Sequence, residues 1–295
     1  MPLRQHGRYP YSPIVERPVY DWPDGRRLAV YIAVNVETFP FGEGLGPELN
    51  ARQPEPDVVN HGWRDWGNRV GVWNLLEALD EHQLPAAALL NTAVYDHHPQ
   101  IAAAFRARGD EVVGHGRTNA ERAADMSPEA EREMIDACTA RISAEEGAAP
   151  AGWMSPWVNE SAQTPELLVE AGYQYTLDWP MDDQPVWLST QARPLLALPY
   201  ARPTNDISAL LGARMAPRAW VDTLFDALDG MLDQSRRQPL VFNLSLHPYL
   251  IGHAFRLQPF RRFLMHLASL RNDLWLTRPG DITRHVAALP EGTVP

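Results

Sequence analysis

Three side chains that exchange protons readily stand at the ends of short, mostly apolar runs of this sequence. These residues are Glu37, His115 and His247, and His115 also lies between two glycines. A carboxylate and two imidazoles can take a proton from water and give one to a leaving group near neutral pH. The three residues therefore predict a site of acid–base chemistry, provided that the fold brings them together.

The apolar runs themselves predict the strands of a parallel sheet. The run from Arg27 to Glu37 is almost continuous, as is typical of a strand buried on both faces. Further strands are expected at 86–91, 111–114, 152–157, 173–178, 195–200, 240–247 and 274–277. Helices are expected at 68–82, 99–108, 127–146, 164–171, 217–236, 260–270 and 281–288. This alternation favours right-handed βα units, and so an α/β fold that forms a single distorted (β/α) barrel of about seven units.

The chain is expected to divide into a short arm and one large domain. A barrel of this kind needs about 250 residues, so the 295 residues do not require two domains. Residues 1–26 are rich in proline and predict an extended N-terminal arm that lies across a neighbouring subunit, and residues 27–295 form the barrel. The segments 38–67 and 180–194 are expected to be loops, and the length of the first is typical of a lid or binding loop.

Further polar residues follow the predicted strands. Catalytic groups of such barrels lie at the carboxyl ends of the strands, where the βα loops gather. Applying this rule, we expect a substrate-binding set made of Asn35, Asn119, Ser155, Trp179, Asp182, Asp183 and Asn205. Asp182 and Asp183 are adjacent, so only one of them is expected to face the site, where it would bind substrate N–H groups or raise the pKa of a histidine.

Composition excludes several classes of partner. The formal net charge of −11 argues against a broad phosphate-binding surface, so we expect no nucleic-acid partner. The sequence has no run of about 20 apolar residues, so no membrane partner is expected. The N-terminus lacks the apolar stretch of a secretory signal, and a single cysteine allows no intrachain disulfide. These features predict a cytoplasmic protein.

The order of the motifs resembles the polysaccharide deacetylase superfamily, also called the chitooligosaccharide-deacetylase homology fold. Along the chain the motifs read Asn-x-Glu, Gly-His-x-x-x-Asn, Ser-Pro-Trp, Asp-Trp-x-x-Asp-Asp and Leu-Ser-Leu-His, each at a predicted strand end. Within the superfamily the pattern is most similar to the allantoinase-like branch, and the resemblance covers roughly residues 20–290. It implies a deacetylase-like barrel and a homo-oligomer.

The sequence departs from this resemblance at several positions. In the metal-dependent deacetylases of the superfamily, the first strand ends with two acids, a base and a metal ligand, and the third offers His-x-x-x-His. Here Asn35 and Glu37 stand at the first motif, and His115 is followed by Asn119. The usual Arg-x-Pro reads Met154-Ser155-Pro156, whereas the last histidine is present as His247.

These departures bear on the metal. A catalytic zinc ion needs about three protein ligands, and the amide oxygen of Asn119 is a poor one, so Glu37 and His115 alone would bind zinc weakly. We therefore expect no cofactor and no tightly bound metal, as the resemblance implies for the allantoinase-like branch. If a divalent ion such as zinc binds weakly, its ligands are expected to be Glu37, His115 and His247.

The resulting hypothesis is a hydrolase of non-peptide carbon–nitrogen bonds, with a small cyclic amide or ureide as substrate. Glu37 takes a proton from the attacking water, His115 positions that water or the oxyanion, and His247 protonates the leaving nitrogen. One alternative is a metal-dependent N-deacetylase of acetylated sugars or polysaccharide. A second is a ligand-binding member of the fold that has lost catalysis.

Overall fold

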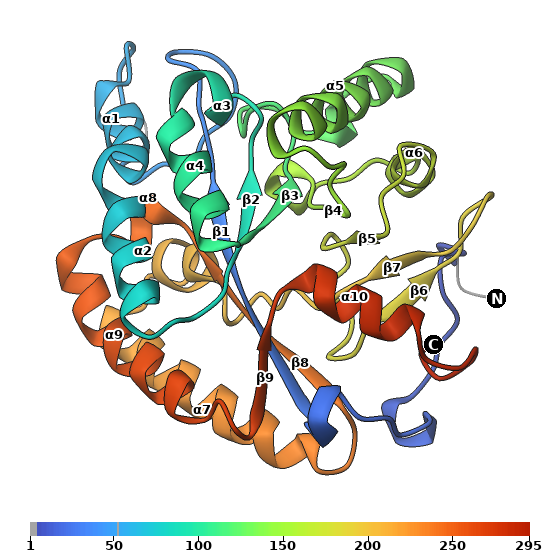
Figure 1. The fold of residues 1–295 in the computed structure, drawn as a ribbon. Helices are drawn as coiled ribbons and strands as arrows, with labels where there is room; N and C mark the ends of the chain where they lie inside the picture. Colours follow the sequence, from blue (N-terminus) through green and yellow to red (C-terminus); the bar gives the residue numbers. More distant parts are fainter. Residues whose placement is uncertain (1–4, 52) are drawn as a thin grey trace.

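The computed structural model describes residues 5–51 and 53–295, and these form a curled sheet surrounded by helices (Figure 1). The strands lie in the order β6-β7-β5-β4-β3-β2-β1-β8, with β9 also paired to β1. Their bounds are β1 Leu28–Val36, β2 Ala87–Leu90, β3 Glu111–Gly114, β4 Gly152–Trp153, β5 Tyr175–Thr176, β6 Val186–Leu188, β7 Leu195–Ala197, β8 Leu240–Leu246 and β9 Leu274–Thr277. Each strand pair is parallel except β6 with β7.

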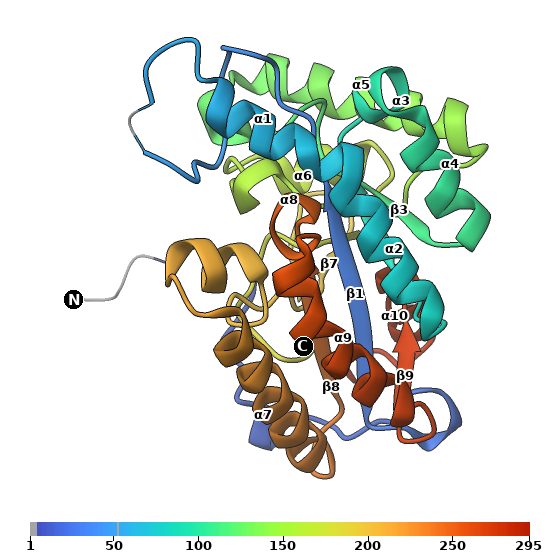
Figure 2. The same cartoon turned by 90° about the vertical axis from the view of Figure 1, so that its left-hand side faces the viewer.

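The helices cover the outer face of this sheet, and the turned view in Figure 2 shows α2, α7 and α9 beside β1 and β8. Their bounds are α1 Val58–Trp66, α2 Val72–Glu81, α3 Val94–His97, α4 Pro99–Arg108, α5 Pro128–Glu146, α6 Thr164–Glu170, α7 Pro217–Ser235, α8 Pro248–Ile251, α9 Ala254–Ser269 and α10 Pro279–Ala287. Two predicted helix ends are confirmed in detail: Ser127 caps α5 by accepting from Ala130 N, and Gly109 ends α4 in the left-handed conformation.

Strand alternation explains how the site residues reach the barrel interior. Side chains of a strand point to opposite faces in turn. The even-numbered residues of β1 and β8 pack in the outer core with the helices, whereas Ala29, Tyr31 and Val241 belong to the inner core. Glu37 and His247 continue the odd, inward-facing series just past the two strands, so the sequence places both at the mouth of the barrel.

The predicted fold class, a distorted (β/α) barrel, is confirmed. The sheet runs from β6 at one end to β8 at the other, and an isolated bridge between Asn205 and Ser245 joins the segment after β7 to β8. This bridge partly spans the gap between the ends of the sheet. The interior is filled by side chains of the inner core rather than left as a channel.

Several predicted elements are corrected by the structure. The segment 180–194 contains β6, a three-residue antiparallel strand too short to give a periodic signal. The second half of the expected loop 38–67 is the helix α1, which continues through a π turn into α2. The helix expected at 260–270 begins at Ala254, because Pro259 is accommodated inside it rather than starting it.

The described part of the arm lies against its own chain. Arg17 makes a bidentate ion pair with Asp182, and Arg8 makes a bidentate ion pair with Glu166. Trp22 is 1% exposed in the inner core and donates a 3.0 Å hydrogen bond to the carbonyl of Leu240. The arm therefore packs on its own barrel, and its contact with a neighbouring subunit stays a prediction.

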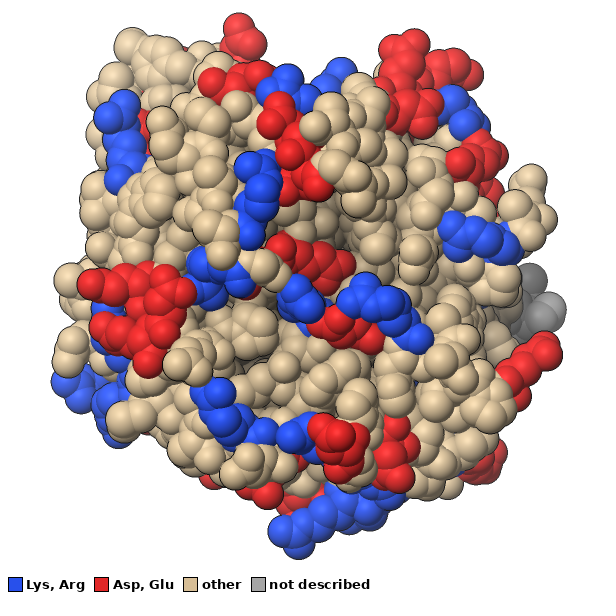
Figure 3. All heavy atoms as spheres, in the orientation of Figure 1, with Lys and Arg blue, Asp and Glu red and all other residues tan. Residues whose placement is uncertain are grey.

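The surface carries mixed charge. On the face drawn in Figure 3, basic and acidic residues alternate and the basic ones form no continuous patch. None of the helices in the described ranges combines the length and the apolar character that a bilayer-crossing segment requires.

Candidate active site

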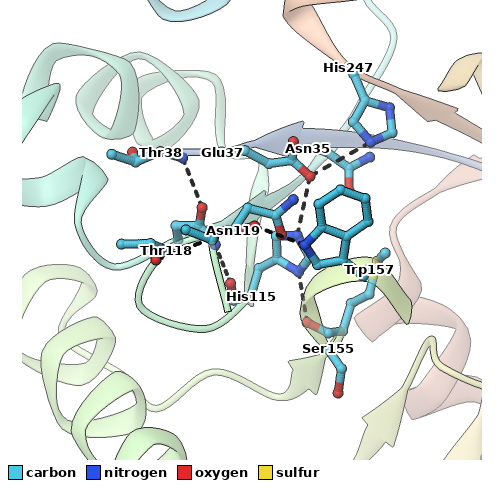
Figure 4. Close-up of polar contacts among 12 residues, drawn as sticks. Asn35, Glu37, Thr38, His115, Thr118, Asn119, Ser155, Trp157 and His247 are labelled. Carbon is cyan, nitrogen blue, oxygen red and sulfur yellow. Dashed lines mark hydrogen bonds and ion pairs between the residues drawn. The ribbon is translucent and has the colours of Figure 1, made fainter. Parts of the chain in front are cut away.

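Glu37 lies at the centre of a buried polar cluster where the strands end (Figure 4). Its Oε1 is 3.6 Å from Nε2 of His115 and 3.7 Å from Nε2 of His247. Its Oε2 accepts a 2.6 Å hydrogen bond from the hydroxyl of Tyr249. One carboxylate oxygen is therefore occupied by the tyrosine, and the other faces both imidazoles. The structure brings the three residues predicted for the chemistry together.

His115 is fixed in one orientation by the chain that follows β4. Its Nδ1 is 2.7 Å from the carbonyl oxygen of Met154, and a carbonyl only accepts, so Nδ1 carries the hydrogen. Nε2 is then the ring nitrogen that faces Glu37. Among the residues that the structure describes, this buried Nε2 has no hydrogen-bond partner. The ring therefore presents an unpaired nitrogen on the side of Glu37.

His247 is held by Asp206, from the segment after β7. Asp206 accepts from the backbone N–H of His247 at 2.8 Å, and its other oxygen is 2.6 Å from Nδ1 of the ring. Both residues are buried. Because Nδ1 donates to this carboxylate, Nε2 is the nitrogen that faces Glu37 and the cavity. Asp206 thereby fixes the orientation and favours the charged form of the ring.

Burial and the neighbouring charges set the protonation of this cluster. Burial by itself would raise the pKa of Glu37, but His247, His115 and the Tyr249 hydroxyl outweigh it, and the pKa of Glu37 is lowered. Burial would lower the pKa of His247, yet Asp206 and Glu37 outweigh it and raise that pKa. The surroundings therefore favour the ionised form of Glu37 and the protonated form of His247.

Tyr249 is positioned by close packing of the chain after His247. Its ring makes edge contacts with Phe39 and Trp63, both from the segment predicted as a loop. The backbone of α8 approaches the π turn between α1 and α2 so closely that a Cβ at Gly67 would lie 2.7 Å from the Tyr249 nitrogen. Glycine is required there because any side chain would displace Tyr249.

A cavity of about 320 Å³ opens above this cluster. Its lining comprises Glu37, Pro47, Asn119, Met154, Trp157, Val158, Tyr200, Arg202, Asn205, Ile207, Ser208, Leu211, Gly212, His247 and Tyr249. Two of the acid–base groups, Glu37 and His247, thus border the cavity directly. His115 is fully buried behind them. The walls combine apolar side chains with a similar number of polar ones, so the cavity offers both apolar contacts and hydrogen bonds to a small molecule.

Four of the residues predicted to bind substrate lie in or behind this cavity. Asn119 and Asn205 line it. Asn35 is buried behind it and donates to the hydroxyl of Tyr200 at 3.2 Å, so it supports a wall residue instead. Ser155 is also buried and donates to Asp178 at 2.7 Å. Burial raises the pKa of this Asp178 carboxylate, whose nearest donors are the N–H and hydroxyl of Ser155.

The other three predicted residues lie elsewhere, which corrects our expectation. Both carboxylate oxygens of Asp182 are bound by Arg17 of the arm. Asp182 and Asp183 line a separate cavity between the arm and the barrel, and neither lines the cavity at Glu37. Trp179 packs edge-on against Tyr9 of the same arm. The rule that places functional groups at the carboxyl ends of strands failed here, because the chain turns away from the mouth of the barrel after Asp178.

Comparison with known proteins places this geometry in a family. The sequence model described as polysaccharide deacetylase matches residues 59–176. The Puue allantoinase structure is 25% identical, with a TM-score of 0.84 over 96% of this chain and 98% of its own. A probable polysaccharide deacetylase from Pseudomonas aeruginosa PAO1 is 25% identical, with a TM-score of 0.83 over 97% and 100%. The partial family match and these two full-length likenesses support the predicted superfamily, that of the polysaccharide deacetylases.

Within this superfamily the full-length likeness to the allantoinase puts the chain in the allantoinase-like branch, as predicted. The family match and the two full-length likenesses identify it as an enzyme of the carbon–nitrogen hydrolase type. A CE4 family pseudoenzyme from Bacillus anthracis shares the fold alone, with 12% identity and a TM-score of 0.53 over 89% of this chain and 66% of its own. A sequence search of curated proteins finds no match.

The metal-dependent members of the superfamily raise the question whether these residues suit a metal ion. In the described ranges, no group of three or more His, Cys, Asp or Glu side chains is arranged to hold one. His247 lies between the carboxylates of Asp206 and Glu37, which favour its protonated form, and that form has no lone pair for a metal. At the position where the metal-dependent members have the second histidine of His-x-x-x-His, this chain has Asn119, whose amide oxygen is a poor zinc ligand. The donor set does not fit a tightly bound zinc ion.

Sequence reasoning missed several residues of this deacetylase-like site. Tyr249 lies only two positions beyond His247, and Asp206 directly follows the predicted Asn205. Tyr200 closes the run 195–200 that was predicted as a strand, although β7 itself ends at Ala197. Trp157 follows Ser155-Pro156, a motif that was recognised. Each of these residues lies near a strand end. The sequence alone, however, does not show which of several consecutive side chains points into the site.

Proposed function

We propose that this enzyme hydrolyses the ring amide bond of a small cyclic amide or ureide, without a tightly bound metal. The observation that carries the proposal is the placement of Glu37, whose Oε2 is held by Tyr249 while Oε1 faces two imidazole nitrogens. This arrangement supplies a base and an acid, 3.7 Å apart, at one small cavity. Hydrolysis of an amide needs both groups.

The first step is attack of water on the amide carbonyl. Glu37 Oε1 takes one proton of the water as the oxygen bonds to the carbonyl carbon, and the unpaired Nε2 of His115 accepts a hydrogen bond from the other hydrogen. This assigns His115 to the water rather than to the oxyanion, since a lone pair cannot stabilise negative charge. The oxyanion is instead stabilised by the side-chain amide of Asn119, which lines the cavity.

The second step breaks the carbon–nitrogen bond. The tetrahedral oxyanion collapses to a carbonyl, the ring C–N bond breaks, and its electron pair takes the Nε2 proton of His247. The product is an open chain with a carboxylic acid at one end and an amine or urea nitrogen at the other. Asp206 stays ionised and stabilises the protonated ring before this transfer.

The size of the cavity supports a compact substrate. Ligand pockets in proteins range from roughly 300 to 1,000 Å³, and this cavity of about 320 Å³ is at the lower end. It accommodates a single small ring rather than a run of sugar units. The likeness to a structure named as an allantoinase points in the same direction.

Turnover of a substrate panel tests this proposal. The panel consists of allantoin, hydantoin, dihydrouracil, succinimide and chitooligosaccharides, with product amines or acids measured directly. We expect turnover of at least one cyclic amide or ureide and none of the acetylated sugars. Release of acetate from chitooligosaccharide with no ring opening would overturn the proposal in favour of a deacetylase. Binding of a ring compound without any turnover would instead show a binding protein.

A further inference from the structure

Trp157 stands in an unusual position at the edge of the cavity. Its backbone has φ 66°, and the next residue, Val158, has φ 52°. Positive φ is uncommon for residues other than glycine and is unfavourable for tryptophan and for a β-branched residue such as valine. This backbone conformation holds Trp157 at the edge of the cavity, which it lines.

The exposure of Trp157 distinguishes it from the packing tryptophans. Trp22, Trp153 and Trp220 are at most 1% exposed, whereas Trp157 is 38% exposed and lines the cavity. A tryptophan that served only to fill the core would bury its large apolar surface. The indole is thus partly exposed and borders the space that a substrate would occupy.

The indole is also fixed in direction. Its Nε1 donates a 2.9 Å hydrogen bond to the backbone carbonyl of Asn119, and the Asn119 N–H donates at 3.0 Å to the carbonyl of Thr38, which follows Glu37 (Figure 4). These two bonds connect the chain segments after β4, β3 and β1. The orientation of the indole is thereby coupled to the position of the catalytic carboxylate.

From these observations we propose that the indole of Trp157 is the platform on which the flat ring of the substrate stacks. This inference rests on the proposed function and narrows it, because a planar ring with an amide bond offers the face that an aromatic side chain binds best. Stacking would present the ring edge, with its carbonyl, to Glu37 and His247. Trp157 is then a specificity-determining residue for the class of planar cyclic amides and ureides.

The test compares Trp157→Gly with Trp157→Phe. Glycine adopts the observed φ without strain, so the Gly variant removes the indole and favours the native backbone. Loss of one aromatic stack weakens binding by about tenfold, so the KM and the dissociation constant of hydantoin or allantoin are expected to rise by about that factor in the Gly variant. The Phe variant keeps a planar face and is expected to lose much less. Trp73→Gly on α2, where Trp73 is 39% exposed and does not line the cavity, is the matched control.

The outcomes separate the two proposals. If the parent opens a cyclic ureide but Trp157→Gly binds it as tightly as the parent does, the platform is wrong and the proposed function stands. If the parent binds and turns over only chitooligosaccharide, the proposed function fails and the platform for flat rings fails with it. Weakened ring binding in Trp157→Gly, with unchanged binding in the Trp73 control, supports both.

Discussion

Replacing Glu37 by Gln is expected to lower kcat by about 10²- to 10⁴-fold, the usual range for loss of a general base. The amide keeps the size of the carboxylate and can still accept from Tyr249, so the fold and the cavity should persist. It cannot take a proton from water. Initial rates on the best cyclic substrate of the panel, together with the melting temperature of the variant, measure the effect.

A matched control is Glu111→Gln. Glu111 also lies within the fold, where it accepts 2.8 Å hydrogen bonds from Tyr175 and from the N–H of Gly280. It begins β3, at the end of the strand opposite to His115. The Glu111 variant is expected to change stability and to leave kcat near that of the parent. Near-normal kcat in the Glu37 variant would remove Glu37 as the base.

Replacing His247 by Gln is expected to lower kcat by about a hundredfold or more, because the leaving nitrogen then departs without a proton donor.

The parent should also lose activity as pH rises through the raised pKa of His247, since only its protonated form can donate. Activity should be lost in acid as pH falls through the lowered pKa of Glu37. The parent pH profile is therefore a broad plateau that extends above the usual histidine range, and the alkaline limb should be absent in the His247 variant.

Asp206→Asn tests the cause of the alkaline limb. Loss of the carboxylate removes a charge that raises the pKa of His247, so the limb should move to lower pH while the acid limb stays in place. His253→Gln is a control, because His253 stacks on Trp66 and does not line the cavity. An alkaline limb that is unchanged in the Asp206 variant would show that another group controls it.

The sequence predicted the fold and the centre of the site because both follow from short-range patterns. Continuous apolar runs marked β1 and β8, and the strand period alone sends Glu37 and His247 to the inner face. The turn after β3 likewise places His115 next to Glu37. What these residues have in common is that each follows its strand directly, where the backbone direction is still fixed.

The sequence could not predict the residues that lie farther from a strand end. Asp182 was expected at the site, yet it is bound by Arg17, which is distant in the sequence. Tyr249 reaches Glu37 only because glycines in the π turn allow α8 to come close. Trp157 depends on two positive φ values that residue type argues against. Each of these placements is decided by long-range packing rather than by local pattern.

The central claim is that Glu37 and His247 perform the hydrolysis without a tightly bound metal. The most direct test measures ring-opening turnover and metal content on the same sample, before and after treatment with a strong chelator and again after adding zinc. We predict that kcat is unchanged by the chelator, is independent of the metal content per chain, and is not raised by zinc. Activity that disappears with the metal and returns in proportion to added zinc would contradict the account.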